Sequence, residues 1–258
     1  MQTFLLVYYG NTGSSWLIQT LGSAPAVFVP AFEPLEKWAW DVSDSERLEW
    51  IRLVFSPPGD RSGPVYEEWL ARLAENPHFS APQRLGFSMV GFKMHAHAID
   101  DRMALLQPLQ ELGSRVILLQ RRNRIKHALS LYRYHEESKS QFDKQGVRPP
   151  SEVDLSVFHR WVRESVVLQR QSEVFWAKAV AVLGRDSLAR VEYEDFIDEP
   201  GKVATMERLA GFIGIEEFSY TASPLRKATS DSLSEAVVNY PALAERYAGT
   251  EFAQFLAD

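Results

Sequence analysis

Several features that define other protein classes are missing from this chain of 258 residues. It has no cysteine, which excludes a disulfide framework and a thiolate metal site. No apolar run reaches the length of a membrane-spanning helix, and no secretory segment is visible at the start. The net charge of -6 argues against a general nucleic-acid binder, so any anion site must be locally basic. With 45% apolar residues, the chain can bury a sizeable core as one domain.

A turn rich in small residues lies near the N-terminus. Residues 4–9 are apolar and aromatic at strand length, and an apolar helical pattern begins at Trp16. A turn between a strand and a helix points backbone N–H groups at one spot, which suits a phosphate. The turn is not a Walker A loop, because the Gly-x-x-x-x-Gly-Lys-Ser/Thr spacing is missing. The turn consists of Gly10, Asn11, Thr12, Gly13, Ser14 and Ser15.

A second candidate anion site follows another apolar strand pattern. Residues 115–120 predict a buried strand, and residues 121–133 predict a basic helix. Strand patterns at 27–29, 87–94 and 188–193 alternate with helical patterns at 46–55, 66–74, 102–112, 155–183, 202–213 and 234–254. This alternation predicts an α/β fold, with a parallel β-sheet flanked by helices. Both candidate sites begin where a strand ends, which is where such sheets bind ligands.

Four features of the sequence belong together: residues 11–17, Arg122 with Ser130, residues 32–35, and residues 191–196 with 209–215. Together they resemble sulfotransferases that use 3′-phosphoadenosine 5′-phosphosulfate (PAPS), nearest to carbohydrate-type and bacterial members. Residues 11–17 resemble the family's 5′-phosphosulfate loop, and Arg122 with Ser130 resembles its 3′-phosphate motif. Phe-Glu-Pro-Leu at 32–35 resembles a stretch of carbohydrate sulfotransferases. Residues 191–196 and 209–215 resemble two late stretches of the superfamily. The resemblance implies one P-loop-like sulfotransferase domain over residues 1–258, PAPS as co-substrate, and no metal.

Two segments look inserted, at about 38–84 and 135–154. Long loops over the carboxyl edge of a sheet often bind the acceptor. The first segment carries four tryptophans, which either pack in the core or present their faces to a sugar ring. They are Trp38, Trp40, Trp50 and Trp69.

The sequence departs from the family at Asn11, where many members carry a lysine or arginine against the leaving oxygen. An asparagine donates a hydrogen bond but carries no charge, and charge-assisted bonds are about twice as strong. Lys93 is the first candidate for the missing cation, followed by Arg226 and Lys227. The last two also resemble an Arg-Lys pair that cytosolic members place on the 3′-phosphate.

Two residues are candidates for the general base. Glu33 lies in the Phe-Glu-Pro-Leu stretch, and its apolar flanks predict a carboxyl pKa raised by desolvation. His95 follows a strand in Phe-Lys-Met-His, which resembles the Lys-Thr-His of cytosolic members. A histidine near its reference pKa needs little tuning to act as a base. The longer match favours Glu33, and His95 stays open. His95 with His97 is too sparse to predict a metal site.

The expected function is sulfuryl transfer from PAPS to a hydroxyl or amine of a small-molecule, glycan or glycolipid acceptor. Two alternatives stay open: a P-loop kinase of a small metabolite, which would need a loop lysine, and a non-catalytic nucleotide- or glycan-binding protein. Because the chain begins at its first strand, we expect a cytoplasmic and bacterial enzyme. A homodimer is left open.

Overall fold

The computed structural model describes residues 1–30, 33–36, 42–56, 67, 71, 87–137, 149–196, 198–218, 230 and 232–256. Most of the two expected insertions and the predicted helix at 66–74 therefore lie outside the described residues. The same holds for Trp38, Trp40, Trp69, Arg226 and Lys227.

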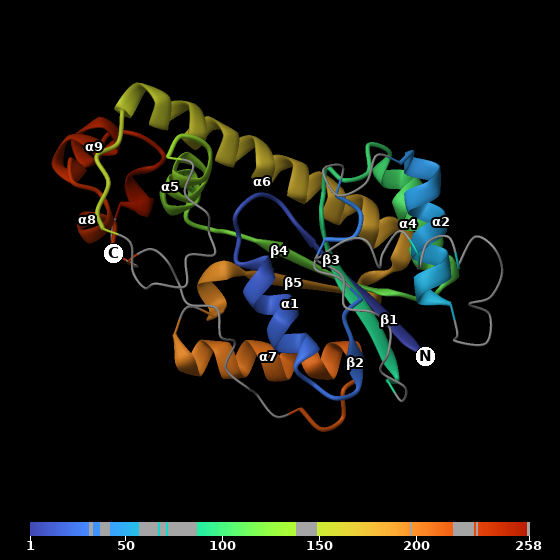
Figure 1. Cartoon of the computed structure of the whole chain (residues 1–258). Helices are drawn as coiled ribbons and strands as arrows, with labels where there is room; N and C mark the ends of the chain where they lie inside the picture. Colours follow the sequence, from blue (N-terminus) through green and yellow to red (C-terminus); the bar gives the residue numbers. More distant parts are fainter. Residues whose placement is uncertain are drawn as a thin grey trace. The chain divides into compact units, whose positions relative to one another are not determined.

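The strands form one parallel sheet. They are β1 (Gln2–Tyr8), β2 (Val27–Phe28), β3 (Met89–His95), β4 (Arg115–Gln120) and β5 (Leu188–Glu192), in the order β2-β3-β1-β4-β5 (Figure 1). The predicted α/β fold class is confirmed. Because β1 is the central strand, the loop that follows it leaves from the middle of the carboxyl edge, where parallel sheets bind ligands.

The described helices match most of the predicted ones. They are α1 (Ser14–Gly22), α2 (Asp44–Phe55), α4 (Arg102–Glu111), α5 (Arg124–His135), α6 (Leu155–Leu183), α7 (Glu199–Ile213), α8 (Leu233–Ala236) and α9 (Tyr240–Tyr247). Helix α7 begins three residues before the predicted start, because the Asp198 side chain accepts a hydrogen bond from the backbone of Gly201 and caps the helix. Short 3-10 turns lie at Arg185–Ser187, Tyr193–Phe196 and Ala253–Phe255.

The predicted start of the basic helix at residue 121 is wrong. Helix α5 begins at Arg124, because the Asn123 side chain accepts a hydrogen bond from the backbone of Lys126 at 2.8 Å. An asparagine in this position ends the preceding extended segment and starts the helix. Arg122 therefore lies ahead of the helix and is exposed.

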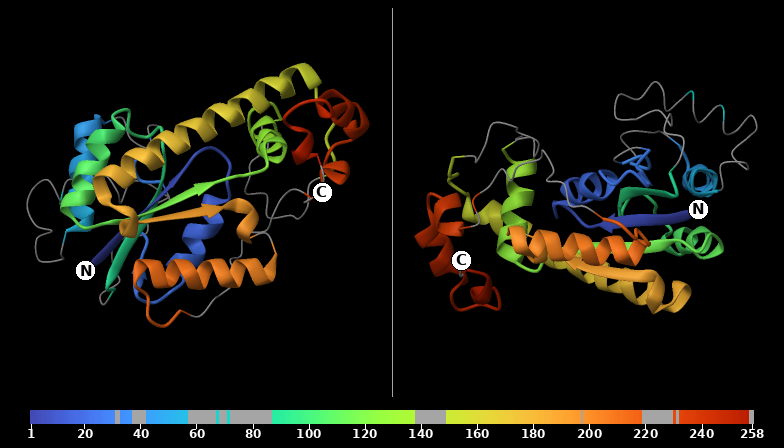
Figure 2. Two further views of the ribbon diagram at one scale, coloured as in Figure 1. Left: turned by 180° about the vertical axis from the view of Figure 1, so that it is seen from behind. Right: turned by 90° about the horizontal axis from the view of Figure 1, so that it is seen from below.

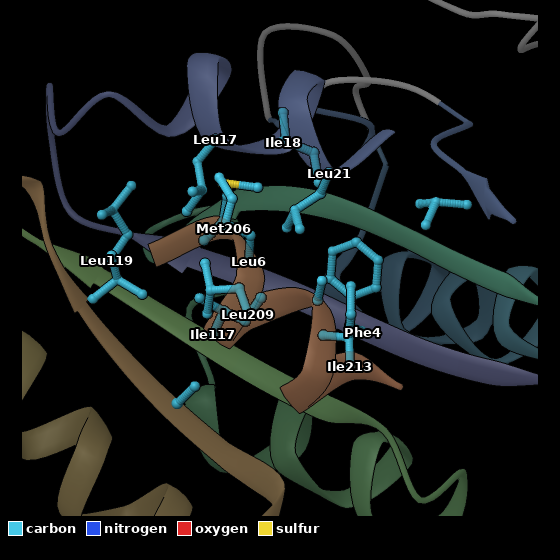
Figure 3. Close-up of a cluster of buried hydrophobic side chains, with 14 of the residues drawn as sticks. Phe4, Leu6, Leu17, Ile18, Leu21, Ile117, Leu119, Met206, Leu209 and Ile213 are labelled. Carbon is cyan, nitrogen blue, oxygen red and sulfur yellow. The ribbon is translucent and has the colours of Figure 1, made fainter. Parts of the chain in front are cut away.

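Helices α1 and α7 cover one face of the sheet (Figure 3). Alternate residues of β1 point to this face, since successive side chains of a strand point to opposite sides. Figure 3 shows the cluster that results, with Phe4, Leu6, Leu17, Ile18, Leu21, Ile117, Leu119, Met206, Leu209 and Ile213. Gly91 on β3 leaves room for the Phe4 ring, which a β-carbon at this position would overlap.

Helices α2 and α4 lie side by side and pack on the opposite face (Figures 1 and 2). Trp50 and Phe55 of α2 contact Phe92 of β3, with ring centroids 5.1 and 5.2 Å apart. Trp50 is buried, so this tryptophan belongs to the core and is not a sugar-binding surface.

The chain forms two compact units. The first comprises residues 1–9, 13–120 and 172–222, and the second residues 10–12, 121–171 and 223–258. The first unit holds the sheet. The second unit holds α5, the N-terminal part of α6, α8 and α9 around its own buried cluster, which includes Tyr132, Phe158 and Tyr247. The single domain expected from the sequence stays a prediction.

Candidate active site

The first part of the site is the N-terminus of α1. Gly13 is the N-cap residue and adopts a left-handed conformation with φ of 82°. Since a glycine has no side chain to cap the helix, the first N–H groups of α1 remain suited to an anion. The helix begins at Ser14, two residues before the predicted Trp16, so Ser14 and Ser15 lie in its first turn.

Lys93 brings the residues of this site together. Its Nζ lies 2.7 Å from Ser15 Oγ, 2.7 Å from Glu33 Oε1 and 3.5 Å from Ser14 Oγ. The side chain is only 3% exposed. Burial lowers the pKa of Lys93, while the charge of Glu33 opposes this shift. A buried cation thus sits between the helix start and a carboxylate.

Glu33 is held at one of its two oxygens. Oε1 accepts hydrogen bonds from Lys93 Nζ and from the Tyr8 hydroxyl. Within the described part of the chain, Oε2 accepts none, and the side chain keeps 23% exposure. Burial by itself would raise the pKa of Glu33, but the Lys93 charge and the two hydrogen bonds outweigh burial and lower it. The predicted raised pKa is therefore wrong.

His95 is the last residue of β3 and lies opposite Tyr8 in the parallel register. Its Nδ1 accepts a hydrogen bond from the backbone of His97 at 3.2 Å. Burial, helped by the charge of His97, lowers the pKa of His95 to about 4. The expectation that this histidine stays near its reference pKa is wrong. The ring is neutral at pH 7 and a weaker base than predicted.

Two residues of the site were missed by the sequence reasoning. Tyr8 ends the strand before the loop, and only its alternation with Leu6 could have indicated that it faces α1. Glu36 accepts a hydrogen bond from the backbone N–H of His95 at 3.0 Å. Burial raises the pKa of Glu36 to about 7, although this backbone hydrogen bond opposes the rise; the nearby Glu33 charge adds to it. Its only sequence signal was the spacing of three residues from Glu33.

Trp16 and Gly13 pack against a stretch that the resemblance had singled out. The ring of Trp16 stacks on Phe196 with centroids 5.2 Å apart and planes 9° apart. A β-carbon on Gly13 would lie 2.9 Å from the ring of Tyr193. Gly13 and Trp16 of the predicted loop are therefore neighbours of the late Tyr-Glu-Asp-Phe stretch in the first unit.

In the second unit, the structure joins a loop residue to the predicted 3′-phosphate motif. Asn11 Nδ2 donates a hydrogen bond to the backbone carbonyl of Ser130 at 3.1 Å. Thr12 is buried, and its hydroxyl lies 3.4 Å from the carbonyl of Gly10. The Asn11 amide thus has a structural partner, and this contact uses the carbonyl and not the hydroxyl of Ser130.

The described ranges contain no group of three histidine or acidic side chains arranged to hold a metal ion. Across the same residues, no helix combines the length and apolar character needed to cross a membrane.

The comparisons with known proteins bear on the fold. No protein-family model and no curated protein matches the sequence. A solved sulfotransferase from Alicyclobacillus acidocaldarius is similar in structure, with a TM-score of 0.50 and 15% identity over 99% of this chain and 92% of that one.

Two further solved structures are less similar. The sulfotransferase domain of the Synechococcus PCC 7002 olefin synthase has a TM-score of 0.46 and 16% identity over 90% of this chain and 82% of that one. A shikimate kinase from Bacteroides thetaiotaomicron has a TM-score of 0.42 and 13% identity over 83% of this chain and 99% of that one. The chain therefore has an α/β, P-loop-like fold that it shares with a sulfotransferase.

Proposed function

We propose that this protein is a PAPS-dependent sulfotransferase that acts on a hydroxyl or amine of a small-molecule or carbohydrate acceptor. The observation that carries the proposal is the position of Lys93 Nζ, 2.7 Å from both Ser15 Oγ and Glu33 Oε1. A helix N-terminus suited to phosphate, a buried cation and a carboxylate thus form one cluster.

Sulfuryl transfer needs a base, and Glu33 fits this role better than His95. The acceptor oxygen attacks sulfur, the bond from sulfur to the bridging oxygen breaks, and its electron pair stays on adenosine 3′,5′-bisphosphate. The acceptor proton goes to Glu33, whose lowered pKa keeps it ionised at neutral pH. Oε2 is the oxygen that takes the proton, since Oε1 already accepts two hydrogen bonds.

Lys93 supplies the positive charge that Asn11 lacks. The Asn11 amide donates to the Ser130 carbonyl, whereas Lys93 Nζ reaches the serines of the first turn of α1. A cation fixed in a buried position stabilises charge that develops on a leaving oxygen better than a solvated one does. The Lys93 charge thereby stabilises both the ionised carboxylate of Glu33 and the negative charge on the leaving oxygen.

The remaining assignments are drawn from the sequence resemblance. Residues 11–16 would bind the 5′-phosphosulfate, and Arg122 with Ser130 would bind the 3′-phosphate. Arg226 and Lys227 are further candidates for that phosphate. A cytoplasmic location, a bacterial source and a homodimer also stay predictions.

Thermal unfolding with nucleotides tests the proposal. A ligand at a hundred times its Kd adds about 2.7 kcal/mol of stability. For a chain of this size, that is about 5–10 °C in Tm. Adenosine 3′,5′-bisphosphate should give this increase without Mg²⁺, and labelled PAPS should then label a member of an acceptor library. An increase with ATP and Mg²⁺ but none with the bisphosphate would favour the kinase. Binding without any transfer would favour a non-catalytic protein.

A further inference from the structure

Tyr8 contacts all three residues that were considered for the chemistry. Its hydroxyl donates a hydrogen bond to Glu33 Oε1, and the centroid of its ring lies 5.2 Å from Lys93 Nζ. The His95 ring meets it edge-on, with centroids also 5.2 Å apart. Tyr8 itself is buried, with 8% of its surface exposed.

The sheet fixes Tyr8 in this position. Tyr8 pairs with His95, and Leu6 pairs with Lys93, in the parallel register of β1 and β3. The backbone N–H of Ala96 donates to the Tyr8 carbonyl at 3.0 Å, which extends the pairing past the end of β3. Since side chains alternate along a strand, Tyr8, Lys93 and His95 all face α1. The hydroxyl of Tyr8 is therefore held rigidly where it meets Glu33.

We propose that Tyr8 is a positioning residue that acts through Glu33, holding Oε1 so that Oε2 is presented to the acceptor. This inference rests on the proposed function. A carboxylate can exchange its two oxygens by rotation about its last bond. With Lys93 and Tyr8 both donating to Oε1, such a rotation would break two charge-assisted hydrogen bonds together. Lys93 alone would restrain the carboxylate less.

The variant Tyr8→Phe tests the contribution of the hydroxyl separately from that of the ring. Phenylalanine keeps the aromatic face near Lys93 Nζ and the edge contact with His95, and removes only the donor to Glu33. Because that donor stabilises the ionised carboxylate, its loss should raise the pKa of Glu33. The other groups around Glu33 stay in place. Lys93 and His95 of β3 act on its carboxylate, Glu36 follows it in the chain with Arg47 beside it, and the hydroxyls of Ser14 and Ser15 of α1 contact Lys93 Nζ.

Steady-state kinetics across pH form the first test. Tyr8→Phe should lower kcat about 10- to 100-fold, the range for a misplaced catalytic group, and leave the Kd of adenosine 3′,5′-bisphosphate unchanged. The acid limb of kcat/KM should move to higher pH. Tyr240→Phe is the matched control, because its hydroxyl donates to the Leu256 carbonyl at 2.8 Å and not to Glu33. The control should keep the wild-type kcat and pH profile. An acid limb that stays in place in Tyr8→Phe would overturn the proposal.

A second test does not depend on turnover. Carbon-13 NMR of labelled glutamate should show a higher titration midpoint for Glu33 in Tyr8→Phe than in the wild type. In the wild type, the Cζ resonance of Tyr8 should move with the same midpoint as Glu33. An unchanged Glu33 midpoint in folded Tyr8→Phe would refute the coupling. If Tyr8→Phe folds poorly, the wild type decides: a Tyr8 resonance that does not follow the Glu33 titration would refute the coupling. A protein that binds no bisphosphate would refute the proposed function, while this titration would still decide the role of Tyr8.

Discussion

Glu33 and His95 are the two candidates for the base, and their surroundings lower both pKa values for different reasons. Burial lowers the pKa of His95 to about 4, whereas Lys93 and Tyr8 lower the pKa of Glu33 in spite of burial. Both are therefore unprotonated at neutral pH. Only Glu33 is also charged there and has an oxygen that no described residue engages.

Glu33→Gln should lower turnover about 10²- to 10⁴-fold, since the amide accepts no proton at neutral pH. The Kd of adenosine 3′,5′-bisphosphate should stay unchanged, because the amide is nearly isosteric. His95→Asn should be the milder change. Wild-type turnover should show no titration by Glu33 between pH 6 and 8, because its pKa lies below its ordinary value. Near-normal turnover in Glu33→Gln, beside a folded and inactive His95→Asn, would assign the chemistry to His95.

Lys93→Met should destabilise the protein through Glu33. Removing one partner of a buried ion pair leaves the other charge uncompensated, at about 3–5 kcal/mol when both are fully buried. Glu33 keeps 23% exposure, so we expect about 2–3 kcal/mol. The double variant Lys93→Met/Glu33→Gln should recover most of this loss. Urea denaturation of the three variants measures it, and an equal or greater loss in the double variant would contradict the pairing.

Glu36 should make stability depend on pH. Its pKa of about 7 lies above its ordinary value, so the folded state binds more protons than the unfolded state between about pH 4.5 and 7. Stability is therefore lost as pH rises through this window. Glu36→Gln removes the titrating group and keeps an acceptor for the His95 N–H. At pH 8 it should exceed the wild type by about 2–3 kcal/mol, with little difference at pH 4.5. Denaturant titrations at the two pH values provide the measurement.

Among the structural elements, the contact between β1 and β3 depends on one glycine. A β-carbon at Gly91 would overlap the Phe4 ring, which is fully buried on the adjacent strand. The same strand pair places Tyr8 beside His95 and Leu6 beside Lys93. A disturbance at Gly91 therefore affects both the core and the site.

Gly91→Ala should cost about 1–3 kcal/mol through overpacking. Adding Phe4→Leu should restore part of the loss, because the smaller side chain leaves room for the methyl group. Gly211→Ala on α7 is the matched control: its β-carbon meets no atom within 4 Å, and alanine favours a helix over glycine by about 1 kcal/mol. The control should be neutral or stabilising in thermal unfolding. A harmless Gly91→Ala would show that β1 and β3 pack less tightly than described.

For the whole molecule, the two units have separate buried clusters. Phe158 belongs to the cluster of the second unit and Leu209 to that of the first. Local opening of a protein follows such cooperative units. The two units should therefore differ in their response to a core truncation.

Phe158→Ala should cost about 3–5 kcal/mol and lower the amide exchange protection of α5, α8 and α9 more than that of β1 and β4. Leu209→Ala should show the reverse order. Native-state hydrogen exchange measures both. An equal loss of protection throughout the chain in either variant would indicate that the chain unfolds as one domain, as the sequence predicted.

Hydrophobic periodicity and the small-residue turn were enough to predict the parallel sheet and the loop after β1. Both are local signals: strand and helix patterns depend on neighbouring residues, and Gly13 starts α1 in its left-handed conformation. The start of a helix was predicted less accurately where a single side chain decides it. Asn123 caps α5, so the helix begins at Arg124 and not at residue 121, and this capping hydrogen bond is visible only in the folded backbone.

The charge states at the site were decided by the tertiary structure alone. Apolar flanks suggested a raised pKa for Glu33, but its partners Tyr8 and Lys93 lie 25 and 60 residues away along the chain. The pairing of β1 with β3 brings these partners together, and burial of the pair then sets the pKa of each group. The hydrophobic patterns of the sequence were enough to predict the α/β architecture, and the motifs named the candidate residues. Which of them are buried, and which charge each one faces, follows from contacts between strands that no local pattern encodes.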